Sequence, residues 1–314
     1  MEYKIYKLQF STAVHFGVNA LDDCEFTMCA DSFFSAMCIE FLNQSEEKMN
    51  IFVENVKAGK VIISDLFPFI DDTYYIPKPM IKIENNESDG DSVIKKAYKK
   101  LKYISVDKFE EYLNGNMDVQ YELDKFNLLL GKKELRTNVT IRNYDEATPY
   151  RVGSFRFNKN SGLYIIVGYE DEEYLYEIED CLISLGFSGI GGERSSGYGR
   201  YELGFGKLNR QMEERLKSDK AGVYMTLSVS LPKECEMDSV LDKCEYVLVK
   251  RSGFISSNHY VNNIRKKDIY LFQSGACLSD KFTGDVYDVS EGNIHPVYKY
   301  AKPLFLEVMP WKMC

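Results

Sequence analysis

The sequence predicts an α+β protein with two domains. Its 314 residues exceed the roughly 100–200 residues of one ordinary domain. Residues 1–207 follow the order β-α-β, an insertion at about 85–160, and β-α-β again, which is the split βαβ or ferredoxin-like order. A polar, helix-like linker follows over 208–221, and residues 222–314 contain mainly short strands. We therefore expect a ferredoxin-like domain followed by a smaller strand-rich domain.

Apolar periodicity defines the first strand and the first helix. Apolar and polar residues alternate from Tyr6 to Ser11, which predicts a strand that ends at 15–17. The segment ADSFFSAMCIEFL then predicts a helix with Asp31 or Ser32 as its N-cap. One stripe of this helix is apolar and consists of Phe34, Met37, Cys38 and Phe41.

The insertion contains a segment of opposite charge to the whole chain. After extended segments at 61–70 and 73–79, helices are expected near 91–101 and 107–114. Residues 132–159 then carry seven Lys or Arg residues against three carboxylates, in short alternating runs around a proline. This pattern predicts a projecting β-hairpin. A solvated hairpin with scattered arginines is the alternative interpretation.

A glycine-rich loop, GGERSSGYGR, occupies 191–200. It follows a buried strand at 162–169 and a helix that is expected to end at Gly186. The apolar stripe of this helix consists of Leu175, Ile178, Leu182 and Leu185. It precedes a strand at 198–203. The loop matches neither the Walker pattern nor the dinucleotide fingerprint, both of which stand between a strand and a following helix. Nucleotide-dependent catalysis on this loop is therefore not expected, and an ordinary tight loop is the simplest alternative.

The second domain is predicted from five strand-like segments at 223–231, 245–251, 268–273, 284–289 and 297–308. Between the second and third of these lies KRSGFISSNHYVNNIRKK (250–267), with five Lys or Arg residues and no acidic residue. Lys250, Arg251 and Ser252 end a strand there and offer a second cradle for a phosphate backbone. A flexible basic loop is an equally good interpretation.

Bulk composition limits the class of protein. The net charge of -9 argues against a simple polycation that coats nucleic acid, although local basic faces remain compatible with it. No segment approaches the ~20 apolar residues of a membrane span. The eight cysteines are scattered without a C-x-x-C pair. We therefore expect a cytoplasmic protein with no metal, cofactor or membrane partner.

These motifs together resemble the RAMP superfamily of CRISPR proteins over nearly the whole chain. The resemblance is carried by a first strand ending in His-x-Gly, by the D-S-x-F-S-A helix and by the GGERSSGYGR loop before the last strand of the first domain. The segment GDVYDV…HPVYKYAKPLFLEV resembles the second domain of the same proteins. The pattern is most similar to the subunit of type III-A (Csm) complexes that caps the 5′ handle of the crRNA.

The resemblance implies a fold, a role and partners. Both domains would be ferredoxin-like and RRM-like, the glycine loop would hold RNA backbone, and the hairpin would project over the guide RNA. The implied partners are the crRNA 5′ handle, the large polymerase-palm subunit and an adjacent RAMP backbone subunit, with one copy of the chain per complex. The implied role is assembly and RNA binding without catalysis.

The chemistry of the candidate residues fits RNA. Consecutive glycines and serines offer open backbone N–H groups and hydroxyls to phosphate oxygens. Arginine adds charge-assisted hydrogen bonds, and the ring of a tyrosine can stack on a base. The RNA-binding candidates are His15, Arg136, Arg142, Arg151, Gly191, Gly192, Arg194, Ser195, Ser196, Gly197, Tyr198, Gly199, Arg200, Lys250, Arg251 and Ser252.

Three alternatives stay open at this point. One is a metal-independent endoribonuclease that processes repeat RNA, with His15 as general acid or base. Another is a backbone subunit, present in several copies, that cuts target RNA; such subunits use a loop aspartate, and Asp22 and Asp23 do not match that loop. The third is a protein-interaction module that binds no RNA.

Overall fold

The computed structural model describes residues 1–18, 20–82, 92–140, 148–220, 222–255, 264–291 and 295–310. Within these residues the largest sheet has seven antiparallel strands in the path β11-β1-β10-β5-β6-β7, with β4 also paired to β10. The expected combination of helices with antiparallel sheets is confirmed. The strands are β1 (Glu2–Phe10), β4 (Val61–Ile63), β5 (Phe67–Ile70), β6 (Thr73–Pro77), β7 (Tyr103–Ser105), β10 (Ser161–Tyr169) and β11 (Tyr201–Gly206).

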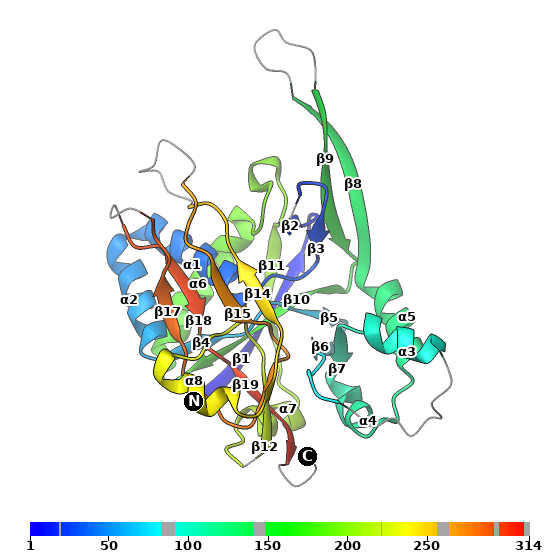
Figure 1. Cartoon of the computed structure of the whole chain (residues 1–314). Coiled ribbons are helices and arrows are strands. Elements are labelled where there is room, and N and C mark those ends of the chain that lie inside the picture. The colour runs from blue at the N-terminus through cyan, green and yellow to red at the C-terminus, as the bar shows by residue number, and fades with distance from the viewer. Residues whose placement is uncertain are drawn as a thin grey trace.

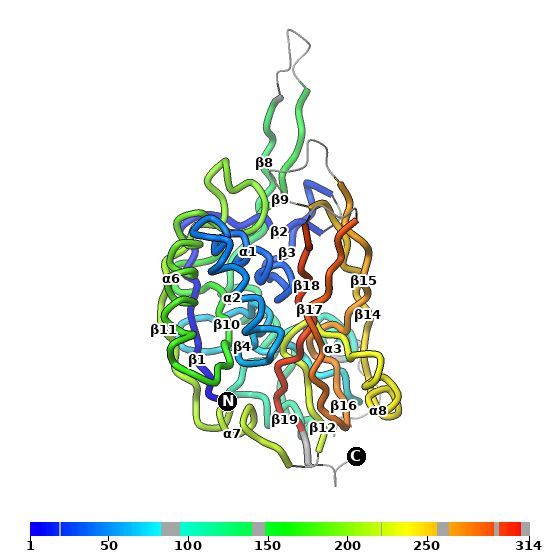
Figure 2. Tube along the Cα trace, turned by 90° about the vertical axis from the view of Figure 1, so that its left-hand side faces the viewer, coloured from blue at the N-terminus to red at the C-terminus, as the bar shows by residue number. Residues whose placement is uncertain are grey.

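Three helices pack against one face of this sheet (Figure 2). They are α1 (Ala30–Gln44), α2 (Glu46–Lys57) and α6 (Glu173–Ser188). Their apolar stripes meet every second residue of β10, so Leu163, Ile165 and Val167 lie in the same core. Most of the stripe predicted for α1 is buried there, although Cys38 is only partly buried.

The opposite face of β10 packs against other parts of the chain, including its C-terminal half. Tyr164 and Ile166 share a second core with α4 (Phe109–Leu113), α7 (Arg210–Leu216), β12 (Gly222–Thr226) and β19 (Phe305–Pro310). Because both faces of β10 are covered, its sequence is apolar without alternation. The segment predicted as a linker is therefore an integral part of the core, with Met212 and Leu216 of α7 buried.

The C-terminal half is rich in strands, as the sequence predicts (Figure 1). One four-stranded sheet has the order β13-β16-β12-β19, where β13 is Cys244–Glu245 and β16 is Cys277–Leu278. Two further antiparallel pairs are β14 (Leu248–Arg251) with β15 (Ile269–Phe272), and β17 (Asp285–Asp288) with β18 (Tyr298–Ala301). The helices here are short, such as α8 (Met237–Leu241) and the 3-10 turn η3 (Glu234–Glu236).

A two-stranded arm extends away from the main body (Figure 1). It consists of β8 (Gly131–Thr140) and β9 (Thr148–Phe157), paired from Gly131↔Phe157 to Thr140↔Thr148. The arm follows α5 (Val119–Leu130), a helix that we did not predict although Asp118 caps it and its apolar stripe is regular. Short helices were expected near 91–101 and 107–114, and the structure has α3 (Ser92–Lys100) at the first and η1 (Val106–Lys108) followed by α4 at the second.

Several predicted element ends were wrong. The first strand ends at Phe10, and the short strand β2 (Phe16–Gly17) pairs instead with β3 (Cys24–Glu25). Helix α6 runs to Ser188 and ends at Gly189, whose φ of 77° suits a residue without a side chain. Neither Asp31 nor Ser32 caps α1, because both lie inside its first turn and the N-cap is Cys29.

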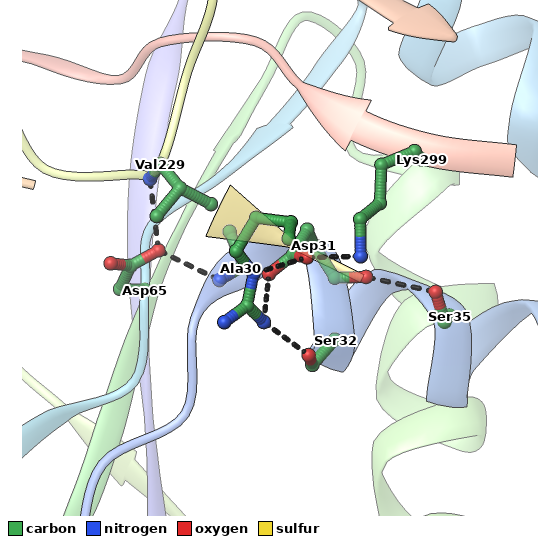
Figure 3. A network of polar contacts seen from close by, with 8 residues as sticks. Ala30, Asp31, Ser32, Ser35, Asp65, Val229 and Lys299 are labelled. Carbon is green, nitrogen blue, oxygen red and sulfur yellow. Dashed lines mark hydrogen bonds and ion pairs between the residues drawn. The ribbon is translucent and has the colours of Figure 1, made fainter. Parts of the chain in front are cut away.

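Asp31 instead forms a buried ion network that joins the two halves of the chain (Figure 3). Arg251 of β14 donates two hydrogen bonds of 2.8 Å to the Asp31 carboxylate, from Nε and Nη2. Lys299 of β18 forms an ion pair with the same carboxylate. Asp31 is fully buried, and these two cations hold the pKa of its carboxyl group below the ordinary value despite burial, which acts in the opposite direction.

A second buried carboxylate supplies the missing helix cap. One oxygen of Asp65 accepts hydrogen bonds from the backbone N–H of Ala30, at 2.7 Å, and of Val229, at 3.1 Å (Figure 3). Asp65 therefore accepts a hydrogen bond from an otherwise unpaired N–H group in the first turn of α1, and it also binds the segment that follows β12. The two carboxylates fix the N-terminus of α1 between the two halves of the chain.

We predict that Asp31→Asn destabilises the protein by about 3–5 kcal/mol, because it leaves the buried Lys299 and the partly buried Arg251 without their counter-charge. Urea unfolding measures this change. Asp268→Asn is the matched control, since Asp268 pairs with Lys250 at the surface and its loss is expected to change stability little. Equal stability of the Asp31 and Asp268 variants would contradict the prediction.

Candidate nucleic-acid interface

The glycine loop is shaped by backbone conformations that favour glycine. Gly189, Gly191, Gly197 and Gly199 have φ between 76° and 90°. At the neck of the loop, Ile190 N–H donates to Gly199 O at 3.0 Å and Gly199 N–H donates to Ala13 O at 2.9 Å. A Cβ on Gly199 would lie only 2.0 Å from Ile190 O. The loop is therefore closed at its neck by contacts that a side chain would prevent.

His15 connects this loop to the base of the arm. Its backbone oxygen accepts a 2.8 Å hydrogen bond from Gly192 N–H, and its side-chain Nδ1 donates to Gly153 O in β9 at 2.6 Å. A Cβ on Gly192 would lie 2.6 Å from the imidazole. His15 is 6% exposed. It lies in the segment after β1, where the sequence predicts an RNA-binding histidine, and its contacts are those of a positioning residue.

The tip of the loop presents polar groups to solvent. Arg194, Ser195, Ser196 and Arg200 are exposed, and η2 (Arg194–Ser196) forms the turn. An open hollow beside the turn is lined by Ser188, Gly191, Gly192, Glu193, Arg194 and Ser195. Tyr198 is only 9% exposed. Stacking of its ring on a base, which the sequence suggests, would require the loop to open.

Two of the predicted RNA-binding arginines, Arg136 and Arg151, lie on opposite faces of the arm. Arg136 is opposite Val152, and Arg151 is opposite Thr137, one register position further along. Since neighbouring residues of a strand alternate between faces, Arg136 and Arg151 point in opposite directions. Both are exposed. Arg156 has a protein partner, the carboxylate of Glu134, at 3.1 Å. Arg142, the third predicted arginine, lies outside the described residues.

The third predicted cluster has contacts within the protein. Lys250 pairs with Asp268 at 2.7 Å, and Arg251 donates to both Asp31 and Ser32. Ser252 is exposed. No sequence pattern connects Arg251 with Asp31, because the two residues lie 220 positions apart. No pattern singles out Lys299 either, which completes this cluster.

The described part of the chain shows neither a metal-binding cluster nor a membrane-spanning helix. No group of three or more His, Cys, Asp or Glu residues in it is arranged to hold a metal ion. None of its helices combines the length and apolarity that crossing a bilayer requires.

Comparison with known proteins identifies the family. The RAMP superfamily model matches residues 19–202, and that of the CRISPR Csm4 C-terminal domain matches residues 219–308. The CRISPR system Cms protein Csm4 of Mycobacterium tuberculosis is 34% identical over 309 residues, which cover 98% of both chains. The Csm4 protein of Streptococcus thermophilus is 31% identical over 315 residues, covering 98% of this chain and 99% of its own.

Solved structures share the fold. The chain aligns with a Csm3-Csm4 subcomplex of the type III-A CRISPR-Cas interference complex at a TM-score of 0.68 and 20% identity, covering 99% of this chain and 100% of the other. It aligns with a Csm1-Csm4 cassette in complex with cA4 at a TM-score of 0.60 and 17% identity, covering 98% and 99%. The sheet, the closed glycine loop and the family matches together define a RAMP-superfamily protein. Within that superfamily the chain belongs to the Csm4 family.

We predict that Gly199→Ala destabilises the protein more than Gly197→Ala. Both glycines have positive φ, which costs other residues about 1–2 kcal/mol. Only at Gly199 would a Cβ meet backbone atoms, because nothing lies within 4 Å of one at Gly197, so Gly199→Ala is expected to cost a further ~1–3 kcal/mol. Urea unfolding of the two variants measures the difference, and equal losses would contradict the closed neck.

Proposed function

We propose that the chain is a non-catalytic crRNA-binding subunit of a type III-A CRISPR interference complex that anchors the 5′ handle of the crRNA. The observation that carries this proposal is the junction at His15, which links the glycine loop to the arm through Gly192 and Gly153. Exposed arginines of the loop and of the arm thereby belong to one end of the molecule (Figure 1).

The proposed interface suits the backbone of single-stranded RNA. Glycine and serine at the loop tip allow close approach of a phosphate, and Arg194 and Arg200 add charge. Arg136 and Arg151 face opposite sides of the arm, so a strand that passes around the arm would meet a cation on either side. The segment 132–159 has a net charge of +4, from seven cations and three anions, within a chain of net charge -9. RNA contact would therefore depend on local charge.

The same proposal treats both halves of the chain as ferredoxin-like domains. In the first sheet the strand order is β11-β1-β10-β4, and in the second it is β19-β12-β16-β13. If the four strands of each sheet are numbered in chain order, and β5, β6 and β7 of the first sheet are left out, both sheets have the strand order 4-1-3-2. This shared order supports two split βαβ units, the second with its helices reduced to short turns.

We further propose partners on the basis of the Csm4 relatives. Solved structures contain Csm4 proteins together with Csm3 in one case and with Csm1 in the other. By analogy, this chain would dock an adjacent RAMP backbone subunit and the large polymerase-palm subunit, as one copy per complex in the cytoplasm. The crRNA handle would lie on the loop and arm between these partners.

His15 supports the non-catalytic interpretation over the endoribonuclease alternative. Metal-independent cleavage needs one group to deprotonate the 2′-hydroxyl and another to protonate the leaving oxygen. The Nδ1 of His15 is committed to a backbone carbonyl, and the side chain is 6% exposed. This environment favours a role in positioning the loop.

A tagged pull-down from the native host tests the proposal. We expect small RNAs that share one fixed 5′ end, a large subunit, and one copy of this chain per complex. Recovery of several copies per complex would favour the target-cutting backbone subunit. Recovery of partner proteins without RNA would favour the protein-interaction module.

We predict that Arg194→Ala and Arg136→Ala each weaken RNA binding about three- to tenfold, because each removes a charge-assisted contact to phosphate. Arg210→Ala is the matched control, since this arginine of α7 is 90% exposed and lies at the other end of the molecule (Figure 1). Filter binding with a crRNA handle oligonucleotide measures the effect. Equal affinity of all three variants would contradict the interface.

We predict that His15→Ala weakens handle binding, because the loop loses its side-chain anchor to the arm, and that wild-type protein does not cleave repeat RNA. The mobility shift of a repeat RNA in a native gel measures binding. The length of the same RNA in a denaturing gel, after incubation without metal ions, measures cleavage. Cleavage by wild-type protein that disappears in His15→Ala would instead establish the endoribonuclease alternative.

A further inference from the structure

Three cations gather around the single carboxylate of Asp31. Arg251 and Lys299 bind it directly. Lys266 is brought beside them because the chain folds back on itself after β14: Lys266 N–H donates to Gly253 O at 3.0 Å, and Phe254 forms a β-bridge with Arg265. The Lys266 ammonium group lies close enough to Lys299 and Asp31 to interact electrostatically with both.

Among the described residues, the three cations of this cluster outnumber the carboxylates that interact with them, Asp31 and Asp65. Asp65 interacts electrostatically with Arg251, and one of its oxygens accepts hydrogen bonds from the backbone N–H groups of Ala30 and Val229. The segment 250–267, which supplies Arg251 and Lys266, contains no acidic residue. Burial and the neighbouring Lys299 lower the pKa of Lys266 to about 8. Two adjacent ammonium groups with one shared carboxylate are short of an anion.

The cluster is built into the core and reachable from the surface. Asp31 is fully buried and Lys299 is 3% exposed at its side chain, so their positions are fixed by packing. The side chain of Arg251 is 26% exposed, Lys266 is half-buried and Ser252 is exposed. Gly253 has φ of 137° and leaves the space beside Lys266 free of a side chain, since a Cβ there would lie 3.4 Å from Lys266 Cε.

We propose that Lys266, Lys299 and Arg251 form an anion site that binds a phosphate group, separate from the glycine loop. An oxyanion there would offset the positive charge that Asp31 and Asp65 leave unpaired and would accept hydrogen bonds from the Lys266 ammonium group. Resting on the proposed function, we assign this phosphate to the RNA backbone. A free phosphate or nucleotide has the same chemistry and is separated from RNA by the experiment below.

Thermal unfolding of the full chain in phosphate and in chloride at matched ionic strength tests the site. We expect phosphate to raise the midpoint of wild-type protein, Lys266→Gln to lose this increase, and Lys266→Arg to retain most of it. Lys267→Gln is the matched control, because Lys267 is its exposed neighbour and is expected to respond as wild type does. Equal stabilisation of wild type and Lys266→Gln, or none in wild type, would overturn the proposal.

Binding of a single-stranded RNA oligonucleotide at several salt concentrations identifies the source of the phosphate. Loss of one phosphate contact in Lys266→Gln is expected to reduce the slope of log K against log salt by about 0.7 and to weaken binding about three- to tenfold. An unchanged slope together with a lost phosphate response would assign the site to a free phosphate compound and overturn its assignment to RNA. Failure of wild-type protein to bind any RNA would contradict the proposed function, while the phosphate measurement would still decide whether the site exists.

Discussion

The buried carboxylate of Asp31 is the interaction on which the arrangement of the two halves depends. It lies in the first turn of α1, and both cations that neutralise it come from the C-terminal half, Arg251 from β14 and Lys299 from β18. Asp65 adds a second connection by capping α1 and holding Val229. Since replacing a buried ion pair by apolar residues often leaves stability unchanged, we infer that this pair serves mainly to fix the relative position of α1, β14 and β18.

Two apolar cores also hold the two halves of the chain together. Strand β10 contributes alternate residues to two apolar clusters, one with the helices of the first half and one with α7, β12 and β19 of the second. Tyr300 of β18 adds a polar contact, since its hydroxyl both accepts from Ile63 N–H and donates to Ile63 O. The strands of the C-terminal half are therefore part of the same packed body as the RAMP-matched region, although separate family models describe the two.

At the end of the molecule that bears the arm, the fixed body carries groups that are free to meet a ligand. The neck of the glycine loop and the imidazole of His15 are packed, whereas Arg194 and Ser195 at the loop tip are exposed. This division is what recognition of a phosphate backbone requires, because the donors must be held in place before the ligand arrives. The overall negative charge of the chain is compatible with this, since residues 132–159 carry a local net charge of +4.

The sequence by itself determined the elements that depend on local patterns. Alternation predicted β1 and the strands of the C-terminal half, the helical stripe predicted α1 and α6, and the glycine spacing located the loop. It also determined the family, because GGERSSGYGR and the D-S-x-F-S-A helix are short contiguous motifs. Helix α5 is not among the predicted elements, although its N-cap Asp118 and its apolar stripe are both local patterns of the sequence.

Only the tertiary structure decided which polar residues are free. Arg251 and Arg194 both lie in segments that contain serine and glycine. Arg251 nevertheless binds a carboxylate 220 positions away, whereas Arg194 is exposed. Tyr198 was expected to meet a base and is buried. A side chain's partner is set by the residues that folding brings beside it, and pairings at that separation leave no periodic trace in the sequence. The chain's local pattern therefore specified where the loop, the arm and the helices form, and long-range packing specified which of their charges remain available for binding.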